Sequence, residues 1–218
     1  MPSVFHTAQF LFRRYFNLFH NHEIYGEENI PSGPVIIAPN HASFYDPPLI
    51  CGSCRDDTYY LARASLFENR LFGWLLRKLN AYPVAGTTSD LASFKIFLSL
   101  LKEQKKVVIF PEGIRTFDGN LTPIKAGIGM LAQRSGCSIV PVYIHGTFEA
   151  WDRSRKYPQL KGRTACVFGK PIDPKQFEHL EKKEAQSQIA EAVRKSIEEM
   201  RADYEKAKEK QDVQDQGG

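Results

Sequence analysis

Short runs rich in β-branched and aromatic residues alternate with longer helical runs through the middle of this 218-residue chain. Strands that are joined by helices run mostly parallel, because the chain returns to the same end of the sheet before each new strand. The sequence therefore predicts an α/β fold with a mixed, mostly parallel sheet covered by helices. The expected strands are residues 35–38, 58–61, 107–110, 139–144 and 164–168, and the expected helices are residues 66–79, 89–103 and 124–134.

An aromatic-rich helix is expected near the N-terminus, at residues 4–19, with Arg13 and Arg14 in its middle. Such an amphipathic helix packs on its own domain, or lies among lipid head groups with its aromatic residues down and its arginines at phosphates. We expect a mixture of both. Charged residues interrupt every apolar run before the roughly 20 residues that cross a bilayer, so the membrane contact is predicted to be peripheral or monotopic.

A second amphipathic helix is expected at the C-terminal end, where Ile189, Val193 and Ile197 recur at helical spacing among many charges. The last residues are rich in glutamine, aspartate and glycine, which predicts a frayed end. We therefore expect a membrane-interface helix at residues 1–22, one central domain at 23–180, a C-terminal helix at 181–210 and a disordered tail at 211–218.

The four cysteines, Cys51, Cys54, Cys137 and Cys166, follow no secretory signal and show no disulfide framework. We interpret them as inert reduced thiols in a cytosol-facing protein, with no metal site. The formal net charge of +4 argues against a nucleic-acid partner and suits a surface that meets acidic lipid head groups.

A histidine and a carboxylate stand where the first expected strand ends. On a continuous helix, His41 and Asp46 would lie about 140° apart, so they can meet only across a turn. Pro39 ends the strand, and Pro47 and Pro48 suit the first turn of a new helix. At such a corner Asp46 would accept a hydrogen bond from His41 Nδ1–H and leave Nε2 free to take a proton from an alcohol. This spacing alone is unspecific.

A polar loop at residues 110–119 follows another expected strand, which places it at the carboxyl edge of the sheet, where α/β proteins bind ligands. Arg115 offers a planar fork of donors that suits a phosphate, and Lys125 adds a point charge. Taken alone, either cation also fits a solvated surface residue.

Several blocks in this order resemble the motifs of the glycerolipid acyltransferases, especially the bacterial 1-acylglycerol-3-phosphate acyltransferases. The resemblance covers about residues 24–171. The blocks are residues 24–31, the His41 to Asp46 segment, the loop at 110–119, Lys125-Ala126-Gly127 and residues 139–147.

The resemblance implies that His41 is the general base and Asp46 its partner, and that Glu112, Gly113 and Arg115 belong to the acceptor phosphate site, with Lys125 beside them. The implied reaction moves a fatty acyl group from acyl-CoA or acyl carrier protein to lysophosphatidate, giving phosphatidic acid in phospholipid biosynthesis. No other cofactor and no metal is implied. Backbone N–H groups after Asp46 or in the Gly113 loop are candidates for stabilising the oxyanion. The implied location is the cytoplasmic face of a membrane.

One position departs from the family pattern, because Gly86 stands where the second block commonly has an arginine. Arg63 or Lys95 is a candidate replacement, or the acceptor is another lysophospholipid or glycerol-3-phosphate. Two further classes stay open: a non-catalytic lipid-binding protein that keeps the fold, and a thioesterase in which water replaces the alcohol.

Overall fold

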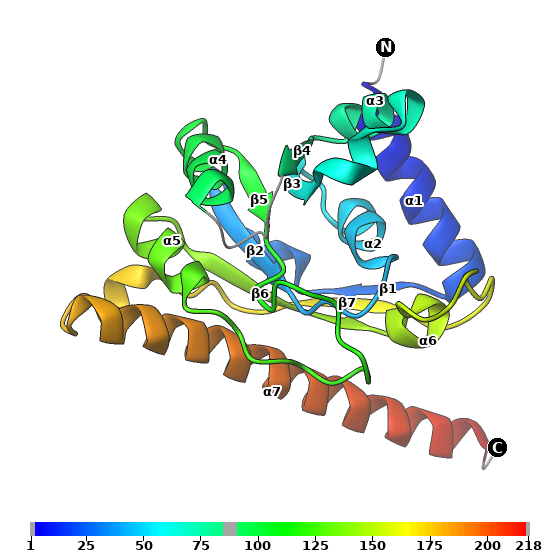
Figure 1. Cartoon of the computed structure of the whole chain (residues 1–218). Coiled ribbons are helices and arrows are strands. Elements are labelled where there is room, and N and C mark those ends of the chain that lie inside the picture. Colours follow the sequence, from blue (N-terminus) through cyan, green and yellow to red (C-terminus); the bar gives the residue numbers. More distant parts are fainter. Residues whose placement is uncertain (1–2, 85–90, 217–218) are drawn as a thin grey trace.

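The sheet forms the middle of three layers, with helices on both of its faces (Figure 1). The structure, a computed structural model, describes residues 3–84 and 91–216. Gly86 lies outside these residues. Within them the sheet has seven strands in the order β1-β7-β6-β2-β5-β3-β4. The strands are β1 (Glu23–Tyr25), β2 (Val35–Pro39), β3 (Thr58–Arg63), β4 (Ala81–Val84), β5 (Lys106–Val108), β6 (Ile139–His145) and β7 (Ala165–Phe168).

The pairing of these strands confirms the expected mixed, mostly parallel sheet. Strand β2 is parallel to both β5 and β6, β3 is parallel to β5 and β4, and β1 is parallel to β7. The β6 and β7 pair is antiparallel. The carboxyl ends of β2, β5 and β6 therefore meet at one edge of the sheet.

Two apolar cores lie on opposite faces of the sheet, and β2 contributes to both. Val35 and Ile37 belong to the core beneath α1 (Val4–His20) and α2 (Asp46–Ser53). Ile36 and Ala38 belong to the other core, beneath α4 (Leu91–Lys102), α5 (Gly127–Ser135) and α7 (Lys182–Gln216). All four side chains are fully buried, as expected of a strand covered on both faces. The remaining α-helices of the described residues are α3 (Arg70–Lys78) and α6 (Thr147–Trp151).

Several element boundaries differ from the sequence prediction. Strands β1 and β4 were not expected, because three or four residues give too short a pattern to distinguish. The helix expected at 66–79 is divided into a 3-10 turn at Ala64–Phe67 and α3, because the Asn69 side chain caps α3 by accepting a hydrogen bond from Phe72 N.

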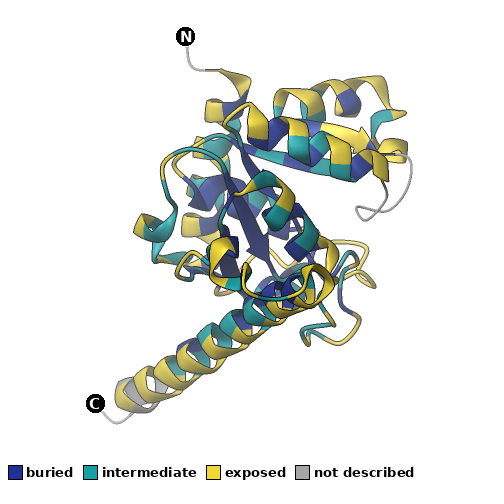
Figure 2. Ribbon diagram, turned by 90° about the vertical axis from the view of Figure 1, so that its left-hand side faces the viewer, coloured by how far each residue is buried: buried dark blue, intermediate teal, exposed yellow. Residues whose placement is uncertain are grey.

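The C-terminal helix is longer than predicted. Helix α7 continues to Gln216, so the disordered tail expected from residue 211 onward is wrong for residues 211–216. No glycine or proline interrupts this stretch, and such residues are the ones that end helices most strongly. The C-terminal part of α7 projects beyond the sheet and is largely exposed (Figures 1 and 2).

Helix α1 has a packed face and an exposed apolar face. Phe5 and Phe16 are buried against the domain, whereas Phe10, Leu11 and Leu18 are 62%, 58% and 76% exposed. No described helix is long and apolar enough to cross a membrane. The expected packing of α1 is confirmed. Figure 2 shows exposed residues along its outer side, and several of the exposed residues are apolar.

The four cysteines are buried and unbonded to one another. Burial raises the pKa of the Cys51 thiol and of the Cys166 thiol to about 12. A thiol with so high a pKa stays protonated near neutral pH and is a poor nucleophile. The geometry agrees with the interpretation of these cysteines as inert thiols.

Candidate active site

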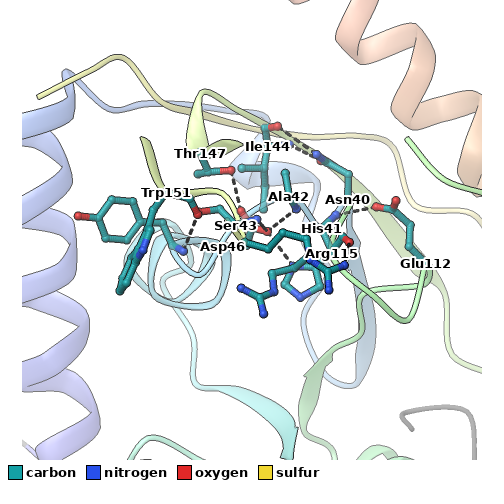
Figure 3. Close-up of polar contacts among 12 residues, drawn as sticks. Asn40, His41, Ala42, Ser43, Asp46, Glu112, Arg115, Ile144, Thr147 and Trp151 are labelled. Atoms are coloured by element: carbon teal, nitrogen blue, oxygen red, sulfur yellow. Dashed lines mark hydrogen bonds and ion pairs between the residues drawn. The ribbon is translucent and has the colours of Figure 1, made fainter. Parts of the chain in front are cut away.

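The ends of β2 and β6 are joined by a side-chain clamp. Asn40, the first residue after β2, accepts a hydrogen bond from Ile144 N at 2.7 Å and donates one to Ile144 O at 3.2 Å. The residue after this clamp is His41, which lies at the carboxyl edge of the sheet (Figure 3). The clamp therefore fixes the backbone from which the imidazole projects.

The structure brings His41 and Asp46 together as predicted, with Nδ1 and Oδ2 2.7 Å apart. Asp46 is fully buried. Its Oδ2 also accepts hydrogen bonds from Ala42 N and Ser43 N, and its Oδ1 accepts one from Thr147 Oγ1 (Figure 3). A carboxylate surrounded by donors acts as an acceptor, so His41 carries its proton on Nδ1. The lone pair of the imidazole is then on Nε2.

The local sequence explains why the Asp46 carboxylate lies here. Asp46 begins α2, and the next two residues are Pro47 and Pro48. Prolines suit the first turn of a helix and have no backbone N–H of their own to offer the carboxylate. The Asp46 side chain therefore bonds the N–H groups of the preceding turn, which closes the corner around His41.

The His41 ring is supported on one side and open on another. It stacks on Phe110, with ring centroids 3.9 Å apart and an interplanar angle of 22°. The side chain is 18% exposed. No hydrogen bond from any described residue reaches Nε2. This nitrogen is available to an incoming hydroxyl group.

Glu112 links the loop at residues 110–119 to the backbone of His41. Its side chain is buried, with Oε1 accepting a hydrogen bond from His41 N at 2.7 Å and Oε2 accepting one from Thr122 N at 2.8 Å. Burial raises the pKa of Glu112, and these hydrogen bonds oppose the shift. The carboxylate is occupied by its own chain and would repel a phosphate. Its carboxylate therefore holds the His41 backbone, and it does so from the same loop that carries Gly113 and Arg115.

Gly113 and Lys125 lie together at the same loop. Gly113 has a φ of +79°, and a Cβ there would come within 2.8 Å of Lys125 Nζ. The backbone N–H of Gly113 donates to Phe110 O, and those of Ala42 and Ser43 are taken by Asp46. Of the loop amides expected as oxyanion donors, that of Gly113 is therefore already bonded, and the two amides before Asp46 are bonded as well.

Arg115 lies beside the histidine with an incomplete set of partners (Figure 3). Its Cζ is 3.5 Å from the centroid of the Phe44 ring. Its Nη1 is buried and has no hydrogen-bond partner among the described residues. Burial lowers the pKa of Arg115, and the nearby charges of Arg153 and Arg63 lower it further. A half-buried guanidinium in this state has the free donors that an anion would need.

The sequence reasoning missed several residues that position the site. Thr147, which bonds Asp46, ends the block at residues 139–147. Asn40 directly precedes the His41 to Asp46 segment, so both residues lay in or beside the recognised blocks. Thr122 and Arg153 carried no local signal. Lys95, the other proposed replacement for the family arginine, is not among the charges that shift Arg115.

A base that can take a proton from an alcohol, beside a site for an anion, suits acyl transfer to a phosphorylated alcohol. The chain belongs to the Acyltransferase family, whose sequence model matches residues 21–145.

Named relatives within this family point in the same direction. The chain is 32% identical over 180 residues to the 1-acyl-sn-glycerol-3-phosphate acyltransferase of Bacillus subtilis, covering 82% of this chain and 87% of that protein. It is 28% identical to a chloroplastic enzyme of the same name from Arabidopsis thaliana, covering 80% of this chain and 50% of that protein.

A solved structure is similar over nearly the whole chain. It is the 1-acyl-sn-glycerophosphate acyltransferase of Thermotoga maritima, which matches with a TM-score of 0.77 and 26% sequence identity. The match covers 91% of this chain and 80% of that one. The sheet with its two helical layers is therefore the fold of a known acyltransferase.

Proposed function

We propose that this chain transfers a fatty acyl group from acyl-CoA or acyl carrier protein to the sn-2 hydroxyl of 1-acylglycerol-3-phosphate. The product is phosphatidate, an intermediate in phospholipid synthesis. The observation that carries the proposal is the open Nε2 of His41, whose Nδ1 is held 2.7 Å from the buried Asp46 carboxylate, beside the incompletely bonded Arg115. The names of the relatives support the same substrate.

The chemistry is a direct displacement at the thioester carbonyl. His41 Nε2 takes the proton of the acceptor hydroxyl while the hydroxyl oxygen bonds to the carbonyl carbon. The tetrahedral intermediate then collapses, the carbon–sulfur bond breaks, and the departing thiolate receives the proton from His41. Asp46 stabilises the imidazolium between the two transfers. No described serine, threonine or cysteine side chain hydrogen-bonds Nε2, which favours direct attack over an acyl-enzyme.

The acceptor phosphate is assigned to Arg115 and Arg63, and we call the region around these two arginines the mouth of the site. Arg115 supplies the planar fork, and Arg63, at the end of β3, lies near enough for its charge to lower the pKa of Arg115. Arg63 is therefore the better of the two replacements for the family arginine at Gly86. Lys125 adds a charge at the neighbouring Gly113 turn. A phosphate held here would keep the sn-2 hydroxyl of the same small molecule close to His41.

The test is to identify the product by mass after offering the purified protein lysophosphatidate with either acyl-CoA or acyl carrier protein as donor. Phosphatidate formation with at least one donor is expected. Thiol release at full rate without any lysolipid would instead identify a thioesterase. Faster acylation of glycerol-3-phosphate or of another lysophospholipid would overturn the assigned acceptor, and no transfer at all would overturn the enzyme.

The exposed face of α1 is proposed as the contact with the cytoplasmic leaflet that holds the acceptor. Phe10, Leu11 and Leu18 form its apolar part, and the Arg14 guanidinium lies 5.9 Å from the Phe10 ring centroid. Aromatic and aliphatic residues interleaved with arginines suit a lipid head-group region. Replacing Leu11 and Leu18 by glutamine should weaken sedimentation with anionic vesicles, while the exposed Asn17→Gln control should not. Equal sedimentation of both variants would overturn this contact.

A further inference from the structure

Arg153 lies in the loop after α6 and extends toward the site loop. Its Cζ is 3.8 Å from the centroid of the Phe117 ring, and its Nη1 is 3.5 Å from Arg115 O. The side chain is exposed to solvent. Two contacts to the segment that carries Arg115 therefore hold a second guanidinium at the mouth of the site, although Arg153 is 38 residues away in the sequence.

The positive charges at this mouth are not balanced by acidic side chains. After burial, the Arg153 charge is the largest influence that lowers the pKa of Arg115, and Arg63 is the next. The opposing negative charge belongs to Asp46. Its carboxylate already accepts four hydrogen bonds from its own chain. Within residues 3–84 and 91–216, no acidic side chain forms an ion pair with Arg63, Arg115 or Arg153.

A neighbouring arginine in the same loop does have an acidic partner. Arg155, two residues beyond Arg153, pairs with Asp152 at 2.8 Å. Clustered guanidinium groups without counter-charges repel one another, and a bound anion removes that repulsion. The buried, unpartnered Nη1 of Arg115 indicates where such an anion would accept a hydrogen bond. The cluster is arranged for an anion of more than one negative charge.

We propose that Arg153 is a specificity-determining residue that selects acceptors with a phosphate monoester over those with a phosphodiester head group. This inference rests on the proposed function. A phosphate monoester carries about −1.5 to −2 charge near pH 7, whereas a phosphodiester carries a single negative charge. Lysolipids with an ethanolamine or choline head group add a cation that the three arginines repel, and such repulsion discriminates between ligands.

The test compares Arg153→Gln with Lys156→Gln, which removes one positive charge from the same loop. Lys156 is exposed and is not among the charges that shift Arg115. Arg153→Gln should raise the KM for lysophosphatidate about tenfold or more, because a charge-assisted contact to the phosphate is lost, and should leave kcat nearly unchanged. Its preference for lysophosphatidate over lysophosphatidylethanolamine should fall by a similar factor. Lys156→Gln should keep the wild-type KM for lysophosphatidate and the wild-type preference between the two acceptors.

A charge-retaining variant separates binding from a general disturbance of the loop. Arg153→Lys should recover most of the lost preference, with the melting temperature of all three variants near that of the wild type. If the wild type forms phosphatidate but Arg153→Gln keeps the wild-type KM and preference, this inference alone is overturned. If the wild type forms no phosphatidate, the proposed function fails and the inference fails with it.

Discussion

Replacing Asp46 by asparagine tests the charge of the buried carboxylate while preserving its shape. In the wild type, Oδ2 accepts hydrogen bonds from two backbone N–H groups and from His41, and Oδ1 accepts one from the Thr147 hydroxyl. The backbone donors cannot rotate away, so the amide oxygen should take the Oδ2 place. The amide NH2 then faces Thr147, whose hydroxyl can turn to accept. The variant should therefore fold and should keep the Nδ1–H tautomer of His41.

The expected loss comes from the missing negative charge. An imidazolium and a carboxylate joined by a 2.7 Å hydrogen bond have charge centres about 4 Å apart, which is worth about 4 kcal/mol at an effective dielectric constant of 20. Asp46→Asn should thus lower kcat by about a thousandfold. The assay is thiol release from acyl-CoA with saturating lysophosphatidate, with urea denaturation to show that the fold remains.

Thr147→Val supplies the matched control for Asp46→Asn. It removes a hydrogen bond from Oδ1 but leaves the carboxylate charged, so it should lower stability by about 1 kcal/mol and reduce kcat far less than Asp46→Asn does. A folded Asp46→Asn variant with kcat within tenfold of the wild type would refute the argument that this carboxylate stabilises an imidazolium.

Three other perturbations follow from the same geometry. Glu112→Ala leaves the His41 N–H without its acceptor, so urea denaturation should show a loss of about 2 kcal/mol and kcat should fall with little change in the KM for the acyl donor. Burial lowers the pKa of His22 from 6.5 to about 4, so the unfolded chain binds the proton more tightly in this window. The free energy of unfolding should then fall by up to about 3 kcal/mol as the pH drops from 6.5 to 4, and His22→Gln should remove that part of the slope. Gly113→Ala places a side chain at a φ of +79° against Lys125 Nζ, which should cost about 1 to 2 kcal/mol and raise the KM for lysophosphatidate.

The parts of the site that the sequence predicted are those made by neighbouring residues. His41 and Asp46 are separated by a single turn, and Pro39 and the two prolines after Asp46 mark the strand end and the helix start that bring them together. Apolar patterning likewise predicted the long, fully buried strands. Such features depend on local geometry, which a sequence displays directly.

Contacts between distant segments could not be predicted in this way. Thr147 reaches Asp46 across 101 positions of sequence and Arg153 reaches Arg115 across 38. Both depend on the order of the strands and the course of the loops between them. Glu112 shows the same limit, because nothing in the sequence indicated that its carboxylate accepts a hydrogen bond from a backbone N–H 71 residues away. Which donor a carboxylate meets is decided by the fold.

The central claim is that His41 is the base that activates the acceptor hydroxyl, and it is tested most directly by measuring phosphatidate formation with His41→Ala. The backbone bond from residue 41 to Glu112 does not involve the imidazole, so the variant should melt near the wild-type temperature. Its rate should fall by about a thousandfold or more, near the upper range for loss of a general base, while the exposed His179→Ala control should keep the wild-type rate. A folded His41→Ala protein that forms phosphatidate at more than about a tenth of the wild-type rate would contradict the account, because that rate is far above the residual activity expected without a general base.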